Sequence, residues 1–498
     1  MRLLFFVMVL FFSTLRAFSQ DYDIVSFGAK PDGKTLNTKA IQKAIDAAHS
    51  SGGGRVVVPV GKFVTGSIRL KSRVELHVEQ DGVLLGSTDP AHYFKINRWK
   101  GLVMADGADH IAITGKGEIN GRGRQVALAI DSLFYAGEID STQYNFVEMR
   151  PKYYLRPQLI ELVSCKNIKI KNITLKNAAC WVQTYDRCVN IVMNNVTTIS
   201  DAYWNNDGID IQDCKNVRIT NCFVDSADDG ICLKSQRADY LCDSIFISNC
   251  TVRSSASAVK FGTVSHGGFK NIVIKNIKVY DTFRSAIAIE VVDGGTLENI
   301  LVDSLTAVNT GNAIFIRLGE RSKKKSMGIL RDVTLRNIKV EVAFERPDYA
   351  YEIRGPALPY FHNIFPSSIT GIPGFPVKDI TLENIEIIYP GKGNKGLAYA
   401  PLSRLDQVPE NVNHYPEFSM FGELPAWGFY IRHVDGLTMK NIKLQIQDPD
   451  YRPALIFDKT QHLELEHVAI TGDDKDQQII LHNTKDVKLD KQENVRRR

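Results

Sequence analysis

Short runs in which apolar and polar residues alternate recur along most of the chain, and an Asn usually separates two such runs. Examples are IKIKNITLKN at 168–177, VRITNCFVDS at 217–226 and ITLENIEIIY at 380–389. Alternation with a period of two is typical of a strand with one buried face. The Asn recurs every 23 to 28 residues, at Asn172, Asn195, Asn221, Asn249, Asn276 and Asn299.

A repeat of about 20 to 30 residues made of short strands indicates a solenoid, because each repeat buries its apolar face only against its neighbours. We therefore predict an all-β fold, a single-stranded right-handed parallel β-helix whose turns lie ~4.8 Å apart. The segment 37–49 has the spacing of an amphipathic helix, with Asn37 placed to cap it and glycines at 52–54 to end it. We expect this helix to cover the open end of the first coil.

After Asn299 the steps between landmark Asn residues lengthen, which predicts long loops at about 342–378 and 390–430. A further excursion is predicted at 121–155. The two later loops are rich in aromatic residues, which suit stacking on sugars and equally suit packing on the coils. These aromatic residues include Tyr351, Tyr360, Phe365, Tyr399, Tyr415 and Trp427.

The first 20 residues place Arg2 before an apolar run at 3–12 and then small or polar residues, the pattern of a signal peptide. A buried N-terminal strand is the alternative. We predict one β-helix domain at 21–490 and a basic tail at 491–498. The protein is then expected to be secreted or periplasmic, without a membrane anchor and monomeric.

Charge and cysteine content exclude some classes of partner. The formal net charge of +5 falls to +3 without Arg2 and Arg16, too little to indicate nucleic-acid binding but compatible with an acidic polymer. The eight cysteines form no CxxC or CxxH pair, so a zinc site is not expected. We predict no metal and no cofactor. Disulfides are possible in an exported protein, but Cys214, Cys222 and Cys250 occupy repeat positions that Asn also takes, which favours buried thiols.

Two successive repeats carry nearly the same acidic phrase, NNDGIDI at 205–211 and ADDGICL at 227–233. Their alignment places Asp207 and Asp229 in one column on neighbouring turns, about 5–6 Å apart at Cα, with Asp228 beside them. Neither phrase contains Lys or Arg. Grouping carboxylates costs free energy, and glycoside hydrolysis requires such a group. A calcium site and plain Asp-Gly turns are the alternatives.

The chain resembles glycoside hydrolase family 28, the polygalacturonase and rhamnogalacturonan hydrolase family. The resemblance rests on DIVSFGAKPDGKTLNTKAIQKAIDAA at 23–48, GEINGRG at 117–123, RPQLIEL at 156–162 and the two aspartate phrases. It implies an inverting hydrolase of pectin in which Asp228 is the general acid. Asp207 and Asp229 then hold and deprotonate the attacking water, with acid and base about 6.5–9.5 Å apart.

Two positions depart from the polygalacturonase pattern. Ser257 replaces the His of a Gly-His-Gly motif, and Ala288-Ile289-Glu290 replaces the Arg-Ile-Lys that grips a substrate carboxylate. Because a glutamate repels a uronate, plain homogalacturonan is a poor candidate and a rhamnogalacturonan-type linkage is favoured. Exo-acting polygalacturonase is the alternative, since the long loops are suited to closing one end of a cleft.

Several further side chains are candidates for substrate binding. Lys260 either supplies the missing positive charge or is a solvated surface lysine. Arg317 follows Glu290 by 27 residues, so the two either form an ion pair on neighbouring turns or bind sugar hydroxyls together. The predicted substrate-binding residues are Asn205, Ser257, Lys260, Glu290 and Arg317.

Two other functions share this fold. A calcium-dependent lyase needs a basic residue beside a calcium cluster, and the aspartate phrases contain none. A non-catalytic carbohydrate-binding β-helix needs no cluster of aspartates.

Overall fold

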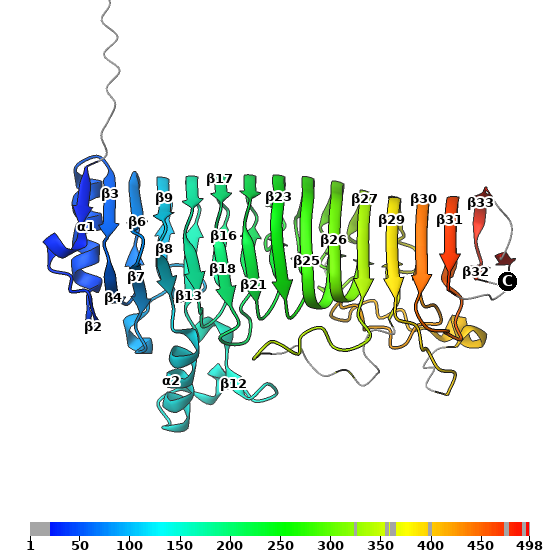
Figure 1. Cartoon of the computed structure of the whole chain (residues 1–498), viewed down its shortest axis with the longest axis horizontal. Helices are drawn as coiled ribbons and strands as arrows, with labels where there is room; N and C mark the ends of the chain where they lie inside the picture. The colour runs from blue at the N-terminus through cyan, green and yellow to red at the C-terminus, as the bar shows by residue number, and fades with distance from the viewer. Residues whose placement is uncertain are drawn as a thin grey trace, which may run out of the picture.

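The computed structural model describes residues 20–322, 326–353, 358, 365–396, 401–472, 478–490 and 495–497. The predicted signal peptide lies outside these residues except for Gln20, as do Tyr360 and Tyr399. The described chain forms a long right-handed parallel β-helix, with the coils stacked along its length (Figure 1). The predicted fold class is confirmed.

Three parallel ladders run along the stack, and we number them by their order within each coil. The first ladder begins with short strands: β1 (Asp21–Asp23), β3 (Gly54–Val58), β6 (Val74–Val78), β9 (Asp109–Gly115), β14 (Lys166–Lys171), β17 (Val189–Asn194) and β20 (Lys215–Thr220). The second contains β2 (Asp32–Leu36), β4 (Gly61–Thr65), β7 (Gly82–Gly86), β10 (Glu118–Asn120), β15 (Thr174–Lys176), β18 (Thr197–Ser200) and β21 (Phe223–Ser226).

The third ladder carries the predicted catalytic residues next to its strands. It contains β5 (Ile68–Arg69), β8 (Gly101–Asp106), β13 (Gln158–Val163), β16 (Gln183–Asp186), β19 (Ile209–Gln212), β22 (Ile231–Ser235), β24 (Val259–Ser265), β28 (Ser367–Thr370), β32 (Ile479–His482) and β34 (Val495–Arg497).

Later strands bend from one ladder into the next. They are β23 (Cys242–Ser254), β25 (Gly268–Val291), β26 (Thr296–Leu318), β27 (Ile329–Val342), β29 (Val377–Tyr389), β30 (Phe429–Ile446) and β31 (Leu455–Thr471), with β33 (Lys485–Leu489) ending the first ladder. Strand β34 falls within the predicted basic tail, so part of that tail pairs with β32 and belongs to the stack.

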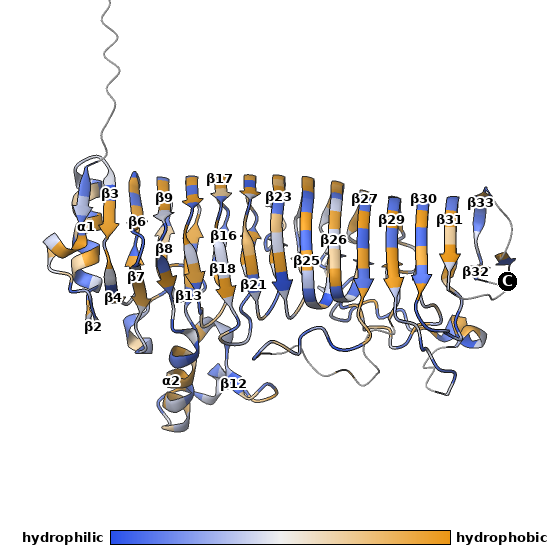
Figure 2. Ribbon diagram, in the orientation of Figure 1, coloured by the Kyte–Doolittle hydropathy of each residue, from blue (hydrophilic) through white to orange (hydrophobic). Residues whose placement is uncertain are grey.

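Stacked aliphatic side chains fill the inside of the coils, and apolar and polar bands alternate along the strands (Figure 2). Ile219, for example, lies between Met193 and Ile247 of the neighbouring coils and is fully buried. Burying one such side chain contributes about 1.5–3 kcal/mol. All eight cysteines are buried free thiols, as the repeat positions predict.

The landmark Asn residues form ladders at the turns. Asn195 donates to Asn172 at 3.0 Å and Asn276 to Asn249 at 3.2 Å. These four residues have positive φ, a conformation that Asn tolerates better than most other residues. The same side chain therefore permits the turn and bonds neighbouring coils.

Helix α1 (Thr38–Ser50) covers the first coil as predicted, with Ile41 and Ala44 buried against the core (Figure 1). The predicted cap is wrong in detail, because the side chain of Asn37 makes no hydrogen bond to the helix. It accepts one from the backbone N–H of Lys30 at 2.8 Å instead.

The excursions from the stack all leave along one edge (Figure 1). The one predicted at 121–155 contains helix α2 (Gly123–Tyr135), which the sequence reasoning missed, and the small antiparallel pair β11 (Tyr144–Asn145) and β12 (Arg150–Pro151). Long connections follow β27 and β29, as predicted. Short 3-10 helices occur at Ile24–Phe27, Pro90–His92, Ser141–Gln143, Tyr153–Leu155 and Leu402–Gln407, the last of them kinked at Arg404. No helix in the described part of the chain is both long and apolar enough to span a membrane.

Candidate active site

The third ladder brings the predicted aspartates together. Ile209 of β19 pairs with Ile231 of β22. Asp207 and Asp229 each lie two residues before these paired positions, so they occupy the same place on neighbouring coils. The backbone N–H of Gly208 donates to the carbonyl of Asp229 at 2.8 Å, which extends the same register. Carboxylate oxygens of Asp207 and Asp229 lie within 4.8 Å of each other. The predicted column is confirmed.

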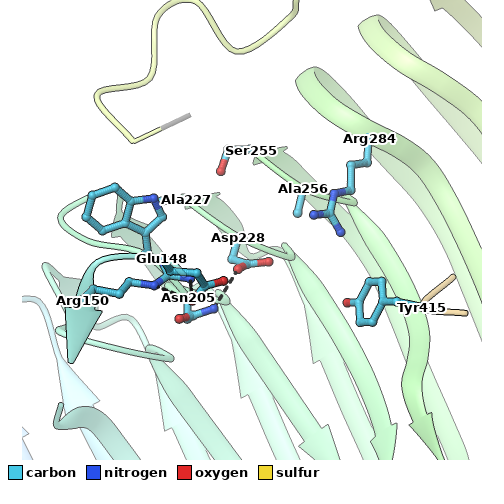
Figure 3. Close-up of a pocket in the computed structure, with 10 residues that line it drawn as sticks. Glu148, Arg150, Asn205, Ala227, Asp228, Ser255, Ala256, Arg284 and Tyr415 are labelled. Carbon is cyan, nitrogen blue, oxygen red and sulfur yellow. Dashed lines mark hydrogen bonds and ion pairs between the residues drawn. The ribbon is translucent and has the colours of Figure 1, made fainter. Parts of the chain in front are cut away.

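Asp228 faces a cleft of about 510 Å³. Its carboxylate accepts from the side chain of Asn205 at 3.4 Å and from the backbone N–H of Asp229 at 2.9 Å. It is half-buried, whereas Asp207 and Asp229 are buried behind it. The cleft is lined by Glu148, Arg150, Trp204, Asn205, Ala227, Asp228, Ser255, Ala256, Arg284 and Tyr415 (Figure 3).

Two buried lysines compensate the carboxylates. Lys234 donates to Asp207 at 2.8 Å and also contacts Asp210, while Lys260 lies 3.1 Å from Asp229. The two aspartate phrases themselves contain no basic residue, so both ammonium groups come from positions outside them. Lys234 directly follows the second aspartate phrase. It lies two residues after Cys232 on β22, so both side chains point to the same side of the strand, and Cys232 pairs with Asp210. This spacing is the signal that places the lysine on the same face as the acids.

The pKa values of the two adjacent aspartates shift in opposite directions. Burial raises the pKa of Asp228, and the negative charge of Asp229 raises it further. Burial also acts to raise the pKa of Asp229, but the charges of Lys260 and Lys234 outweigh burial and lower it. Asp228 is thus suited to keep a proton and Asp229 to stay ionised, which is the division that acid–base catalysis requires.

Asp207 belongs to a second buried group. Burial raises its pKa well above the usual value, although the ammonium group of Lys234 opposes the shift. Burial likewise raises the pKa of Asp210 to about 6. Asp229 is therefore the carboxylate of the cluster that most readily remains a base.

Lys260 is not a solvated surface lysine. It is 2% exposed and lies between Asp229 and Glu290, with Nζ 4.0 Å from the Glu290 Oε2 atom. Glu290 is equally buried, and this burial raises its pKa to about 7 even though Lys260 opposes the shift. Neither side chain lines the cleft, so both act behind Asp229.

The other predicted binding residues fall in different places. The backbone N–H of Ser257 donates to Asp229 at 3.2 Å, and Asn205 contacts Asp228. Arg317 pairs in register with Glu290, as the spacing predicts, but its guanidinium donates to the carbonyls of Glu410 at 2.7 Å and Gly371 at 3.1 Å. Its donors therefore hold a loop, and this geometry favours neither the predicted ion pair nor sugar binding.

Sequence reasoning missed the walls of the cleft. Arg156 is buried and donates to the side chain of Asn205 at 2.8 Å and to the carbonyl of Trp204 at 2.6 Å, so it fixes both cleft residues. Among the loop aromatics, Tyr415 is half exposed in the cleft. Its hydroxyl accepts from Thr263 at 3.0 Å. Three of the loop aromatics named from the sequence are buried instead, namely Tyr351, Phe365 and Trp427.

Comparison with known proteins identifies the family. The model of glycosyl hydrolases family 28 matches residues 50–346, more than half of the chain. This chain belongs to glycosyl hydrolase family 28. It is therefore a glycoside hydrolase, and the resemblance seen in the aspartate phrases is confirmed.

Curated relatives match parts of this family 28 chain. A "Probable polygalacturonase" of Vitis vinifera is 26% identical over 398 residues, covering 76% of this chain and 71% of the relative. An "Exo-poly-alpha-D-galacturonosidase" of Dickeya chrysanthemi is 29% identical over 258 residues, covering 44% of this chain. That match spans only 42% of the Dickeya protein.

Solved structures share the fold of this family 28 chain. An exopolygalacturonase from Thermotoga maritima superimposes with a TM-score of 0.63 at 22% identity, covering 85% of this chain and 91% of that one. A family 28 exopolygalacturonase from Yersinia enterocolitica gives 0.66 at 19% identity, covering 95% and 79%.

Proposed function

We propose that this family 28 hydrolase cleaves α-galacturonosyl linkages in pectin by an inverting mechanism. The observation that carries the proposal is the placement of Asp228 in the cleft with Asp207 and Asp229 buried side by side behind it, and the opposite pKa shifts of Asp228 and Asp229 agree with it. A protonated carboxyl exposed to the cleft and an ionised carboxylate behind it are the two groups that glycoside hydrolysis uses.

In this mechanism Asp228 donates its proton to the glycosidic oxygen while the bond from that oxygen to the anomeric carbon breaks. A water molecule attacks the anomeric carbon from the opposite face of the sugar. Asp229, assisted by Asp207, accepts the proton that this water loses. One proton leaves Asp228 and one reaches the base, so solvent exchange returns the enzyme to its starting state.

A rhamnogalacturonan-type substrate fits the site better than plain homogalacturonan. Lys260 does not present a free positive charge to the cleft, because Asp229 and Glu290 enclose it. Exo action is the second candidate. The hairpin residues Glu148 and Arg150 and the loop residue Tyr415 flank the acid, and the Dickeya relative is named as an exo-enzyme. Secretion is part of the proposal and rests on the apolar N-terminal segment.

The test is to incubate the protein with homogalacturonan and with rhamnogalacturonan oligosaccharides and to identify the products by mass. Hydrolysis adds water to the product, whereas a lyase leaves an unsaturated sugar. Following the first turnover by proton NMR reports whether the anomeric configuration inverts. A chelator is expected to leave the rate unchanged, and loss of activity on chelation supports the lyase instead.

Asp228→Asn is the matched variant. We expect turnover to fall by about 10²–10⁴-fold with substrate binding retained, because the amide cannot supply the proton. Asp239 is exposed and does not line the cleft, so Asp239→Asn is a control that should keep full activity. Binding without turnover in the unmodified protein would favour a non-catalytic carbohydrate-binding β-helix.

A further inference from the structure

The cleft presents one guanidinium on each side of the catalytic acid. Figure 3 shows Arg150 on one side of Asp228, and Arg284 with Tyr415 on the other. An exposed aromatic ring lies on each side. The Arg150 guanidinium carbon is 5.3 Å from the centre of the Trp204 ring, and Tyr415 lies on the side of Arg284. Aromatic faces of this kind stack on sugar rings, so each half combines a guanidinium with a ring that can hold a sugar.

The two halves differ in how tightly a glutamate holds the arginine. Glu148 neutralises Arg150, since one carboxylate oxygen accepts from Nε at 2.9 Å and from Nη2 at 2.6 Å. The donors of this arginine that could grip a second carboxylate are thus already engaged. The Glu148–Arg150 side offers polar groups without net charge.

Arg284 is held less tightly, because among the described residues it forms only a long ion pair with Glu417. Its nearest described carboxylate is that of Glu417 at 3.6 Å, too far for a hydrogen bond. Its guanidinium makes no hydrogen bond within the described part of the chain, and its Nε is buried without a partner there. A cleft guanidinium whose donors make no hydrogen bond can bind a carboxylate through charge-assisted and often bidentate hydrogen bonds.

The backbone explains why Arg284 reaches the cleft. The pairing of β25 with β26 shifts register between Thr282 and Ser285, so Arg284 belongs to an irregular step of the coil. Such irregularities redirect a side chain that regular alternation aims elsewhere. Arg284 also precedes by four residues the Ala288 position at which the expected basic residue is missing.

We propose that Arg284 and Tyr415 form a subsite for a uronate, whose carboxylate Arg284 binds, and that Trp204 with the Glu148–Arg150 pair forms a subsite for a neutral sugar. The scissile bond at Asp228 then joins a uronate to an uncharged residue. This inference rests on the proposed pectin hydrolysis and deepens it, because it names which residues select an alternating acidic and neutral chain.

The assignment is tested by measuring the unmodified enzyme and its variants on two substrates that differ only in their carboxylates. The substrates are a rhamnogalacturonan oligosaccharide and the same oligosaccharide with its carboxylates reduced to primary alcohols. The measured quantity is the ratio of kcat/KM for the native over the reduced substrate. In Arg284→Gln we expect this ratio to fall by about 10- to 100-fold, the effect of losing a charge-assisted hydrogen bond.

Arg150→Gln is the matched control, since it also removes a cleft guanidinium. We expect it to lower kcat/KM for both substrates alike and to leave the ratio within about threefold. Arg284→Gln could also act by changing the ionisation of Asp228. In that case kcat/KM falls equally for the native and the reduced oligosaccharide, and the ratio does not change. An unchanged ratio in Arg284→Gln, or a fall confined to Arg150→Gln, overturns the proposal.

Binding separates this inference from the proposed reaction. If the unmodified protein hydrolyses neither oligosaccharide, the proposed function fails. Calorimetric titration of the same two oligosaccharides then makes the comparison through Kd. Selective weakening of the native oligosaccharide in Arg284→Gln supports the uronate subsite, and equal weakening of both refutes it. Thermal unfolding of each variant confirms that the fold is intact.

Discussion

Replacing Lys260 by Met removes the ammonium group that lies 3.1 Å from Asp229. Burial acts to raise the pKa of Asp229, and the charge of Lys260 is the largest of the effects that lower it. Two unit charges about 4 Å apart attract by about 4 kcal/mol at an effective dielectric constant of ~20. Lys234 and Arg284 still act on Asp229 in the variant. We therefore expect about 1.4–3 kcal/mol of this effect to be lost, equivalent to one to two pH units.

The sign follows from the role of Asp229 as a base. Because Lys260 keeps the pKa of Asp229 below its usual value, the ionised form persists to low pH in the unmodified enzyme. Without the lysine, Asp229 takes up a proton at higher pH. The acidic limb of the profile of kcat/KM against pH should then move upward by about one to two units.

Two variants control this experiment. Lys260→Arg keeps the charge and should leave the acidic limb close to its original position. Lys270→Met removes an exposed lysine that pairs with Glu298 on the surface of the stack, and should change nothing. An acidic limb that stays in place in Lys260→Met, whatever happens to kcat, would show that Lys260 does not govern the ionisation of Asp229.

Further predictions concern the stack and its loops. Ile219→Ala leaves a cavity between buried neighbours and should cost about 2–5 kcal/mol in urea unfolding, against about 0.5 kcal/mol or less for the exposed Val192→Ala; equal costs would contradict the stacked core. The thiol reagent DTNB should label no cysteine in the native protein and all eight after unfolding without reductant, whereas fewer would reveal disulfides. Arg317→Met removes the donors to Glu410 and Gly371 and should hasten proteolysis within 401–428, unlike the exposed Arg331→Met. Unchanged cleavage would show that other contacts hold this loop.

The predicted arrangement of Asp207 and Asp229 needed only local sequence. Each coil pairs with its neighbours, so the repeated phrase and its length determine which residues share a column. Strand parity likewise decides which side chains point inward, as for Ile219. The fold and the core of the catalytic group therefore follow from periodicity.

The surroundings of that group depended on contacts that periodicity does not describe. Helix α2 lies in an excursion whose sequence has no repeat to compare with, and Arg284 sits where the register of β25 shifts. Tyr415 reaches Thr263 from 152 residues away along the chain. The sequence by itself determined the coils and the column of acids, because neighbouring repeats impose them. Only the tertiary structure decided which loop side chains enclose the cleft, since those loops dock through long-range contacts with no register to count.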